Sequence, residues 1–282
     1  MSPSPCASIV IPTLGRPRYL EVTLASVAAQ ALEAGAEILV VNDGGDPETE
    51  RVAASHGARV VSLPERRGVN GARNAGIRAA RSDLVILLDD DVEVSPGWLS
   101  AMLEGARANP EHEVLGGPIR GRLEGGPKGC GREPPPISTL DFGPVDRDVP
   151  FIFGGNTAFR RSVFERIGYF NDELSGRGDE EEWVLRYTAS GGRIRYVARA
   201  SLDHRRSDAD AHLGALTRAA YAQGREARRH DVRAGTARPV RTELRILAGC
   251  VWHTARRRCA YGIVMGAKAA GSLRQALVER RA

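Results

Sequence analysis

Apolar runs and amphipathic segments alternate along the first third of the chain. Four runs of mostly β-branched or aliphatic residues end at Gly, Pro or Asp and predict strands, at 7–13, 37–42, 58–63 and 84–88. The segments between them predict helices at 18–32, 47–56 and 70–82. In the first of these, 18–32, apolar residues recur at helical spacing. Continuously apolar strands that alternate with helices indicate an α/β fold with a mostly parallel central sheet covered on both faces.

The sequence changes character after the first sheet elements. Residues 116–150 are rich in Gly and Pro and predict an irregular loop. FIFGGNTAFRRSVFERIGYF then predicts a strand, a Gly-Gly-Asn turn and a helix, and GRGDEEEWVLRYTASGGRIRYV predicts a helix with an acidic start and another strand. After SLDHRR the chain is helical and basic. We therefore expect an α/β domain at 1–206 and a C-terminal helical region at 207–282.

Charge is distributed unevenly between these regions. The chain of 282 residues has a formal net charge of +5, but residues 204–282 contain 17 Lys and Arg against 6 Asp and Glu. This basic region lacks interleaved aromatic residues and any recognisable module for nucleic acid, so no nucleic-acid partner is expected. Its helices have apolar faces, at Leu213, Leu216, Ala220, Tyr221 and Gly224 and at Leu244, Leu247, Val251 and Ala255. Arg256 to Arg258 suit an anionic membrane surface, and a solvated face explains them equally well.

The remaining compositional features favour a cytoplasmic location. The stretch MSPSPCASIV has neither the basic start nor the apolar segment of a signal peptide. The apolar run from Ile246 to Ala255 is half of the roughly 20 residues that a spanning helix needs. The four cysteines are irregularly spaced, without a CxxC pair, which predicts thiols rather than a metal cluster or disulfides. Peripheral contact with the inner face of the membrane remains open.

Acidic residues follow two of the predicted strands directly. Asp43 ends one strand, and Asp89, Asp90 and Asp91 come after the run LVILL. The carboxyl ends of parallel strands lie at one edge of a sheet, where such folds bind ligands. Three adjacent carboxylates repel one another unless positive charge lies among them, and Mn²⁺ or Mg²⁺ bound with a phosphate would supply it. The alternative is an acidic loop that caps the next helix.

Three further segments carry candidate chemistry. In GRGDEEEW, flanking glycines would let a carboxylate approach a hydroxyl as a general base, with Glu180 as first choice and Asp179 as second. The alternative is that these acids complement the start of a helix. His204 follows a strand and is an acceptable Mn²⁺ ligand, although a lone His is more often structural. Arg73 in NGARNAG would meet a diphosphate, or lie in solvent as part of an ordinary amphipathic helix.

Taken together, these motifs resemble one enzyme family over residues 7–206. VIPTLGRP, EILVVNDGG, NGARNAGIRAARSDLVILLDDD, FGGNTAFRRSVFERIGYFNDEL, GDEEEW and the late His resemble glycosyltransferase family 2, which has the GT-A fold. The helical tail is similar to the extension that some bacterial members carry. The resemblance implies the following sites: Thr13, Asp43, Arg73, Asp89, Asp90 and Asn156 for the nucleotide sugar, Asp91 and His204 for the metal, and Glu180 or Asp179 for catalysis.

The resemblance implies transfer of a sugar from a UDP-, GDP- or dTDP-sugar to an acceptor hydroxyl, by a single displacement that inverts the anomeric centre. The alternatives are a retaining GT-A transferase, which would not need Glu180 as a base, and a non-catalytic nucleotide-binding protein of the same fold. A sugar nucleotidyltransferase is disfavoured, because IPTLGRPR is a poor match to the phosphate loop of that class.

Overall fold

The computed structural model describes residues 4–127, 129–131, 136–174, 180–233 and 235–279. Within these residues the chain forms two compact units. The first contains residues 1–120, 139–175 and 179–204, and the second contains residues 121–138 and 205–282. The second unit thus includes part of the Gly- and Pro-rich segment as well as the C-terminal helices, and each unit is described separately below.

The first elements of the first unit agree with the alternation of apolar and amphipathic segments. They are β1 (Ser8–Thr13), α1 (Pro17–Ala34), β2 (Glu37–Asp43), α2 (Pro47–Ser55), β3 (Arg59–Leu63), α3 (Gly68–Ala79) and β4 (Leu84–Leu88). Local chemistry sets their ends. Helix α1 begins at Pro17 and ends before Gly35, whose φ of 71° is favourable for glycine. Asp46 caps α2 by accepting a hydrogen bond from the Thr49 amide.

The elements that follow are shorter. They are β5 (Val92–Val94), α4 (Trp98–Ala108), β6 (Val114–Gly116), β7 (Ile119–Leu123), β8 (Arg147–Val149), β9 (Asn156–Arg160), α5 (Ser162–Ile167), α6 (Glu181–Ala189), β10 (Ile194–Tyr196) and β11 (Leu202–Arg206). The prediction of a strand at FIF before the Gly-Gly-Asn turn is wrong. Residues 151–153 are irregular, and the strand starts at Asn156, after the glycines. Ile152 is nevertheless buried, which accounts for the apolar character of that run.

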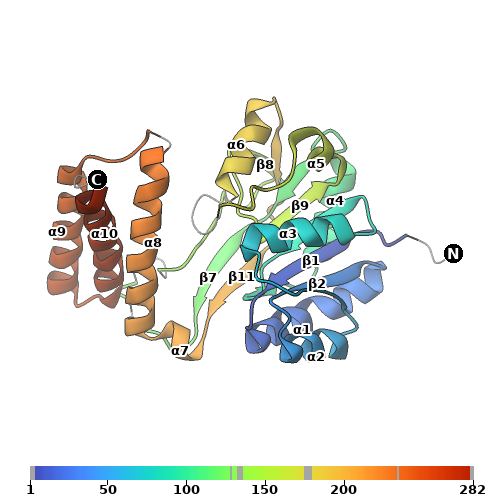
Figure 1. Ribbon diagram of the computed structural model, residues 1–282, viewed down its shortest axis with the longest axis horizontal. Helices are drawn as coiled ribbons and strands as arrows, with labels where there is room; N and C mark the ends of the chain where they lie inside the picture. The colour runs from blue at the N-terminus through green and yellow to red at the C-terminus, as the bar shows by residue number, and fades with distance from the viewer. Residues whose placement is uncertain (1–3, 128, 132–135, 175–179, 234, 280–282) are drawn as a thin grey trace. The chain divides into compact units, whose positions relative to one another are not determined.

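The central sheet has eight strands in the order β3-β2-β1-β4-β9-β6-β10-β8. Strands β1 to β4 pair in parallel, and β9 pairs antiparallel with β4 and β6. A smaller sheet has the order β5-β11-β7. Helix α3 covers one face of β1 and β2, and α1 and α2 lie on the other (Figure 1). Gly76 lets α3 pack directly on the sheet, because a Cβ there would clash with Val10 and Val41.

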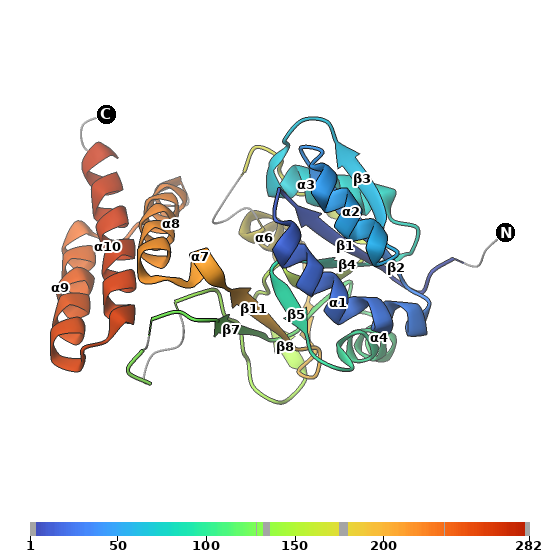
Figure 2. The ribbon, with the colours of Figure 1, turned by 90° about the horizontal axis from the view of Figure 1, so that it is seen from below.

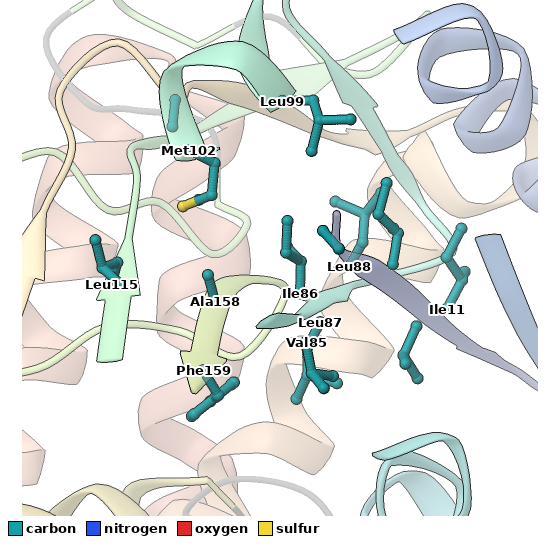
Figure 3. Close-up of a cluster of buried hydrophobic side chains, with 14 of the residues drawn as sticks. Ile11, Val85, Ile86, Leu87, Leu88, Leu99, Met102, Leu115, Ala158 and Phe159 are labelled. Carbon is teal, nitrogen blue, oxygen red and sulfur yellow. The ribbon is translucent and has the colours of Figure 1, made fainter. Parts of the chain in front are cut away.

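The apolar core of the first unit lies on both faces of the central strands (Figure 3). Leu99 and Met102 of α4 lie on the side toward which Ile86 points, whereas Val85 and Leu87 point to the opposite side. Alternation of side chains along β4 therefore buries LVILL from two directions. A strand buried this way is rigid up to its last residue, and the acids that follow it start from a fixed position.

The second unit contains α7 (Asp208–Ala211), α8 (Leu213–Arg233), α9 (Val240–Arg257) and α10 (Ala260–Glu279). Helix α10 packs against both α8 and α9 (Figure 2). Glycines permit the close approach of α8 and α10, since a Cβ at Gly224 or Gly271 would clash with the backbone of the other helix. Within the described residues, no helix combines the length and apolar character that crossing a bilayer requires. The apolar face expected on α9 is only partly covered, with Leu244 and Val251 exposed.

Candidate active site

Strand pairing brings together three segments that are distant in the sequence. The register of β4 and β9 places Leu88 opposite Asn156, so the acids after β4 lie beside the glycines before β9. The pairing of β11 with β5 places His204 opposite Val92, which follows Asp91. Because β9 is antiparallel to β4, the start of one strand meets the end of the other. The carboxyl ends of the parallel strands therefore lie beside the start of the antiparallel strand β9, and both contribute residues to the same edge.

Arg16 forms ion pairs with two of the three adjacent acids. Its Nη1 lies 2.8 Å from Asp90 Oδ1 and its Nη2 lies 2.9 Å from Asp91 Oδ2. Burial lowers the pKa of Arg16, but the attraction of Asp90 and Asp91 outweighs this effect and raises it above its ordinary value. Burial raises the pKa of Asp90 to about 7, against the opposing effect of Arg16. The Arg16 guanidinium thus places positive charge beside Asp90 and Asp91.

Two threonines fix the backbone and side chain of the acidic turn. Thr13 Oγ1, at the end of β1, donates to Asp90 Oδ2 at 2.6 Å. Thr23 of α1 donates to the carbonyl of Asp90 at 2.8 Å, and its hydroxyl accepts from the Val92 amide. Both threonines are buried. The turn between β4 and β5 is therefore held in place by Thr13 of β1 and by Thr23 of α1.

Arg73 of α3 lies between the remaining acid and the candidate base. Its Nη2 is 3.5 Å from Asp89 Oδ1 and 3.6 Å from Glu180 Oε2. The arginine side chain is 5% exposed, whereas Asp89 and Glu180 are 38% and 22% exposed. A buried cation thus orients two carboxylates that remain accessible to a substrate. Of the two readings of the NGARNAG helix, the structure excludes the one with Arg73 in solvent.

Gly154 and Gly155 make this arrangement possible. The amide of Gly154 donates a hydrogen bond to Glu180 Oε2. A Cβ at Gly154 would clash with Glu180 and crowd Arg73, and a Cβ at Gly155 would clash with the Asp89 carboxylate. The pair is needed for close approach of side chains to the backbone, which is one of the uses of glycine. Glu180 itself is the residue that precedes α6.

Two predicted residues have their side chains bound to protein groups. The carboxylate of Asp43 accepts hydrogen bonds from the amides of Arg67 and Gly68, at 2.7 and 2.9 Å, at the start of α3. Asn156 accepts from Trp98 Nε1 at 2.9 Å and donates to the carbonyls of Pro118 and Ala200. Both side chains therefore support the walls of the site.

The residues predicted to hold a metal ion are close together. His204 Nε2 lies 3.4 Å from Asp91 Oδ2, and both side chains are largely buried. An imidazole and a carboxylate at this separation fit the coordination sphere of Mn²⁺ or Mg²⁺, which takes few protein ligands and completes its shell with water and phosphate oxygens. Arg16 shares the same Asp91 oxygen, so a cation and this guanidinium would compete for it. Asp179, the second candidate base, lies outside the described residues.

The sequence-based prediction missed Arg16 and the two glycines as site residues. Arg16 lies in LGRP, directly after the first strand, and its position at a carboxyl end was a signal that could have identified it. The sequence predicts only a turn at Gly154 and Gly155. Their role depends on the antiparallel pairing of β9, which local patterns do not reveal.

The fold of the first unit is that of the GT-A glycosyltransferases. The model of the family described as glycosyl transferase family 2 matches residues 8–168, and the chain belongs to this family. The predicted family, fold class and transferase activity class are thereby confirmed. The helical tail expected from the resemblance is present as α8 to α10.

Curated relatives match this chain over part of their length, and two of them are 26% and 29% identical to it over the aligned residues. The glucosyl-dolichyl phosphate glucuronosyltransferase of Haloferax volcanii is 26% identical over 221 residues, 70% of this chain and 68% of that protein. The pre-mycofactocin glycosyltransferase of Mycobacterium tuberculosis is 29% identical over 184 residues, 61% of this chain and 38% of that protein. The chain thus spans about two thirds of the first relative and well under half of the second.

Solved structures share the fold at lower identity. The structure of GalNAc-T7 with UDP, GalNAc and Mn²⁺ superposes with a TM-score of 0.56 at 17% identity, covering 78% of this chain and 48% of that chain. The structure of S. aureus TarS gives a TM-score of 0.56 at 19% identity, covering 76% of this chain and 39% of that chain. At these identities the likeness concerns the fold.

Proposed function

We propose that the chain transfers a sugar from a nucleoside-diphosphate sugar to an acceptor hydroxyl, with inversion at the anomeric carbon and with the help of a divalent cation. The observation that carries this proposal is the position of Glu180, which shares the buried Arg73 guanidinium with Asp89. A candidate general base is therefore held beside the acids that would receive the donor. The Gly154 amide orients the same carboxylate.

In the proposed step the acceptor oxygen forms a bond to the anomeric carbon, and the bond between that carbon and the phosphate oxygen breaks. The electron pair of the broken bond leaves with the diphosphate, and the proton of the acceptor hydroxyl passes to Glu180. Arg73, fixed by its buried position, places positive charge beside the reacting groups. Asp179 is the alternative base.

The other predicted residues have proposed roles in donor binding. Thr13 and Asp90 would contact the nucleotide and its ribose or sugar, and Asp89 would line the nucleotide pocket. Asp43 would bind the base and Asn156 would line the sugar region. Both side chains also form hydrogen bonds with protein groups, Asp43 with the Arg67 amide and Asn156 with Trp98 Nε1. Asp91 and His204 would bind Mn²⁺ or Mg²⁺. When bound, such a cation supplies positive charge that stabilises the leaving diphosphate.

The solved relative with UDP and Mn²⁺ supports a nucleotide donor and a divalent cation, because it shares the fold. The donor nucleoside is proposed to be uridine, guanosine or thymidine. The cytoplasm, where nucleotide sugars are made, is the proposed location.

The test of Glu180 is a comparison of transfer rate with donor binding. Glu180→Gln keeps the size of the side chain but removes the base, so kcat should fall by about 10²- to 10⁴-fold while the Kd for the nucleoside diphosphate stays unchanged. Glu181→Gln, one residue further and inside α6, is the matched control and should retain the rate. Equal loss of donor binding and rate in Glu180→Gln would contradict the role of base. The anomeric configuration of the product distinguishes the inverting mechanism from the retaining alternative.

Contact with an anionic membrane is proposed for α9. Its exposed apolar side chains include Leu244, Val251 and Trp252, at 53%, 62% and 66% exposure, and Arg256 lies 5.9 Å from the Trp252 ring. Aromatic and basic side chains on one helix suit the interface of a membrane, where each basic residue contributes about 1 kcal/mol. The Haloferax relative is named for a dolichyl phosphate substrate, which agrees with work at a lipid surface.

Flotation with phosphatidylglycerol vesicles tests this contact. The wild type should float with anionic vesicles and not with phosphatidylcholine vesicles, and Trp252→Ala should reduce the bound fraction. Leu32 of α1 is apolar and 85% exposed, and Leu32→Ala should leave flotation unchanged. Absence of wild-type binding to anionic vesicles would remove the proposal.

A further inference from the structure

Three side chains with soft or borderline donor atoms meet in the second unit. The sulfur atoms of Cys130 and Cys259 and a ring nitrogen of His253 all lie within 4.8 Å of one another. Cys130 Sγ and His253 Nε2 are 3.5 Å apart. Cys259 is buried and the other two are partly buried. The acids and His204 of the candidate active site belong to the first unit and take no part in this cluster.

The local fold holds each of the three donors in place. His253 is on α9, and Cys259 lies in the short connection between α9 and α10. Arg258, just before Cys259, has a φ of 49°, a left-handed conformation that is unusual for a residue with a side chain and turns the chain sharply. Gly262 allows α10 to start close to α9, because a Cβ there would clash with Thr254.

The third donor comes from an irregular segment of the same unit. Cys130 lies in the Gly- and Pro-rich stretch after β7, more than a hundred residues before the other two. Its neighbour Gly129 packs on the ring of Tyr261, where a Cβ would clash with the ring. The ring of Tyr261, two residues after Cys259, thus packs against the backbone at Gly129, next to Cys130. The same contact brings the two thiols to one place.

We propose that Cys130, His253 and Cys259 form a zinc site. Two thiolates and one imidazole are a ligand set that favours Zn²⁺ over Mg²⁺, Mn²⁺ or Ca²⁺, which prefer oxygen. With a Zn–S bond of about 2.3 Å and a Zn–N bond of about 2.0 Å, tetrahedral geometry requires sulfur and nitrogen to be about 3.5 Å apart. The distance between Cys130 Sγ and His253 Nε2 matches this value. A water molecule would take the fourth position.

Such a site would link the segment around Cys130 to the turn between α9 and α10. The described residues on either side of Cys130, 124–127 and 129–131, lie in no helix or strand, so the metal would help to hold them in place. The zinc site holds structure in the second unit, and it is independent of the donor chemistry proposed for the first. Loss of zinc should therefore change the stability of the second unit and leave metal-dependent nucleotide binding in place.

The first test measures zinc in the full chain. Protein purified without chelator, then dialysed, should contain one zinc per chain by mass spectrometry of the metal, and EDTA should remove it. Addition of ZnCl₂ to stripped protein should restore one zinc per chain and raise Tm, whereas MgCl₂ should leave Tm unchanged. CoCl₂ added to stripped protein should give the near-ultraviolet absorption of thiolate-to-cobalt charge transfer. Carboxylates do not give that band, so the active-site acids cannot produce this signal.

Single substitutions assign the ligands. Cys130→Ser and Cys259→Ser should each lose the bound zinc and the charge-transfer band, and His253→Gln should weaken both. Cys250→Ser is the matched control, since it removes a thiol from the same helix as His253, one turn earlier, and should keep one zinc per chain. Helical circular dichroism recorded on each variant identifies any that fails to fold, and the titration of stripped wild type does not depend on the variants.

Three outcomes would overturn the proposal. Stripped wild type that takes up no zinc, at concentrations where the chain remains folded, would exclude the site. Zinc that remains bound with the charge-transfer band intact in both Cys130→Ser and Cys259→Ser would assign it elsewhere. A Cys130–Cys259 disulfide in protein kept under reducing conditions, seen as a mass lower by two hydrogen atoms, would show that the cluster is a redox pair.

Discussion

The acidic edge of the first unit and the Cys130–His253–Cys259 cluster of the second unit both suit a divalent cation, yet the chain encodes them in different ways. The acids are contiguous, at Asp89 to Asp91, and follow a strand that the apolar pattern predicts. The soft donors come from an irregular segment, from helix α9 and from the connection between α9 and α10. A site formed by neighbours in sequence is visible as a motif, whereas a site formed by tertiary contacts alone requires the fold.

The two sites also differ in how the polypeptide neutralises its ligands. Arg16 and Arg73 flank the acids and carry the compensating charge within the protein. In the Cys130–His253–Cys259 cluster the donors lie close to one another, with Cys130 Sγ and His253 Nε2 3.5 Å apart. We expect this charge compensation within the protein to suit a cation that enters with substrate. The Cys130–His253–Cys259 cluster suits a cation that stays.

The largest expected effect is a loss of transfer rate in Gly154→Ala without a change in zinc content. Gly154→Ala introduces a methyl group that clashes with Glu180 and crowds Arg73, so the candidate base must move. A displacement of about 1 Å from productive geometry can reduce the rate by about 10²-fold. Transfer assays should show this loss, while zinc content stays at the wild-type level.

Gly249→Ala is the matched control for that substitution. Gly249 lies within α9 and has open space where a Cβ would be placed, so the change should leave the transfer rate intact. A Gly154→Ala enzyme with the wild-type rate would contradict the close-approach role of this glycine.

A smaller effect concerns the charge that Arg16 places among the acids. Arg16→Gln removes the partner of two buried carboxylates, which should lower the free energy of unfolding by about 1 to 3 kcal/mol in metal-free buffer. Because Arg16 and the proposed cation would share Asp91 Oδ2, MnCl₂ should stabilise the variant more than it stabilises the wild type. Urea unfolding with and without MnCl₂ measures both quantities.

Arg18→Gln is the control for the loss of one positive charge from the same segment, and it should leave the response to MnCl₂ unchanged. If Arg16→Gln responds to MnCl₂ no more than the wild type does, the competition between guanidinium and cation is absent.

The smallest effect lies away from both sites. Glu37 accepts hydrogen bonds from the Ser8 hydroxyl and the Arg81 amide, at 2.6 and 2.7 Å, and pairs with Arg59. Burial raises the pKa of Glu37, but these bonds outweigh it, with Ser8 the strongest, and the pKa lies below its ordinary value of 4.5. A lowered carboxyl pKa contributes stability that is present above pH 4.5 and is lost as the pH falls through the folded-state value.

Glu37→Gln should therefore reduce the free energy of unfolding by about 1 kcal/mol at neutral pH, with the difference from wild type shrinking below pH 4.5. Urea unfolding across this range measures it. Binding of Mn²⁺ and Zn²⁺ should be unchanged, and a difference that grows as the pH falls would reverse the assigned sign.

The parts of the fold that sequence predicts best are those with local signals. The alternation of strands and helices up to Leu88 follows from apolar runs, from Pro17 at a helix start and from Gly35 at a helix end. The run FIF misled the prediction because burial of Ile152 in a loop produces the same apolar pattern as a strand. Strands of three residues such as β6 and β8 carry too little periodicity to be identified, whereas β10 was predicted from RIRYV after the Gly-Gly pair.

The candidate site was predictable to the extent that its residues follow strand ends. The prediction placed Asp89 to Asp91 at the edge of the sheet, and His204 close to Asp91, although the pairing of β11 with β5 that brings His204 there had no local signal. Arg16 contacts acids that are 74 and 75 residues away in the sequence, and only the tertiary structure shows that this arginine is their partner. The prediction of four separate thiols missed the proximity of Cys130 and Cys259 for the same reason.

The central claim is that the acidic edge binds a nucleoside diphosphate together with a divalent cation. Its most direct test is thermal unfolding with UDP, GDP, dTDP, CDP and ADP, each with and without MnCl₂, on the wild type and Asp91→Ala. At about a hundred times its Kd, a nucleotide should stabilise the chain by roughly 2.7 kcal/mol. We predict one preferred nucleotide, a shift that requires Mn²⁺, and loss of that shift in Asp91→Ala. A shift of the same size without Mn²⁺ and in Asp91→Ala, or no shift with any nucleotide, would contradict it.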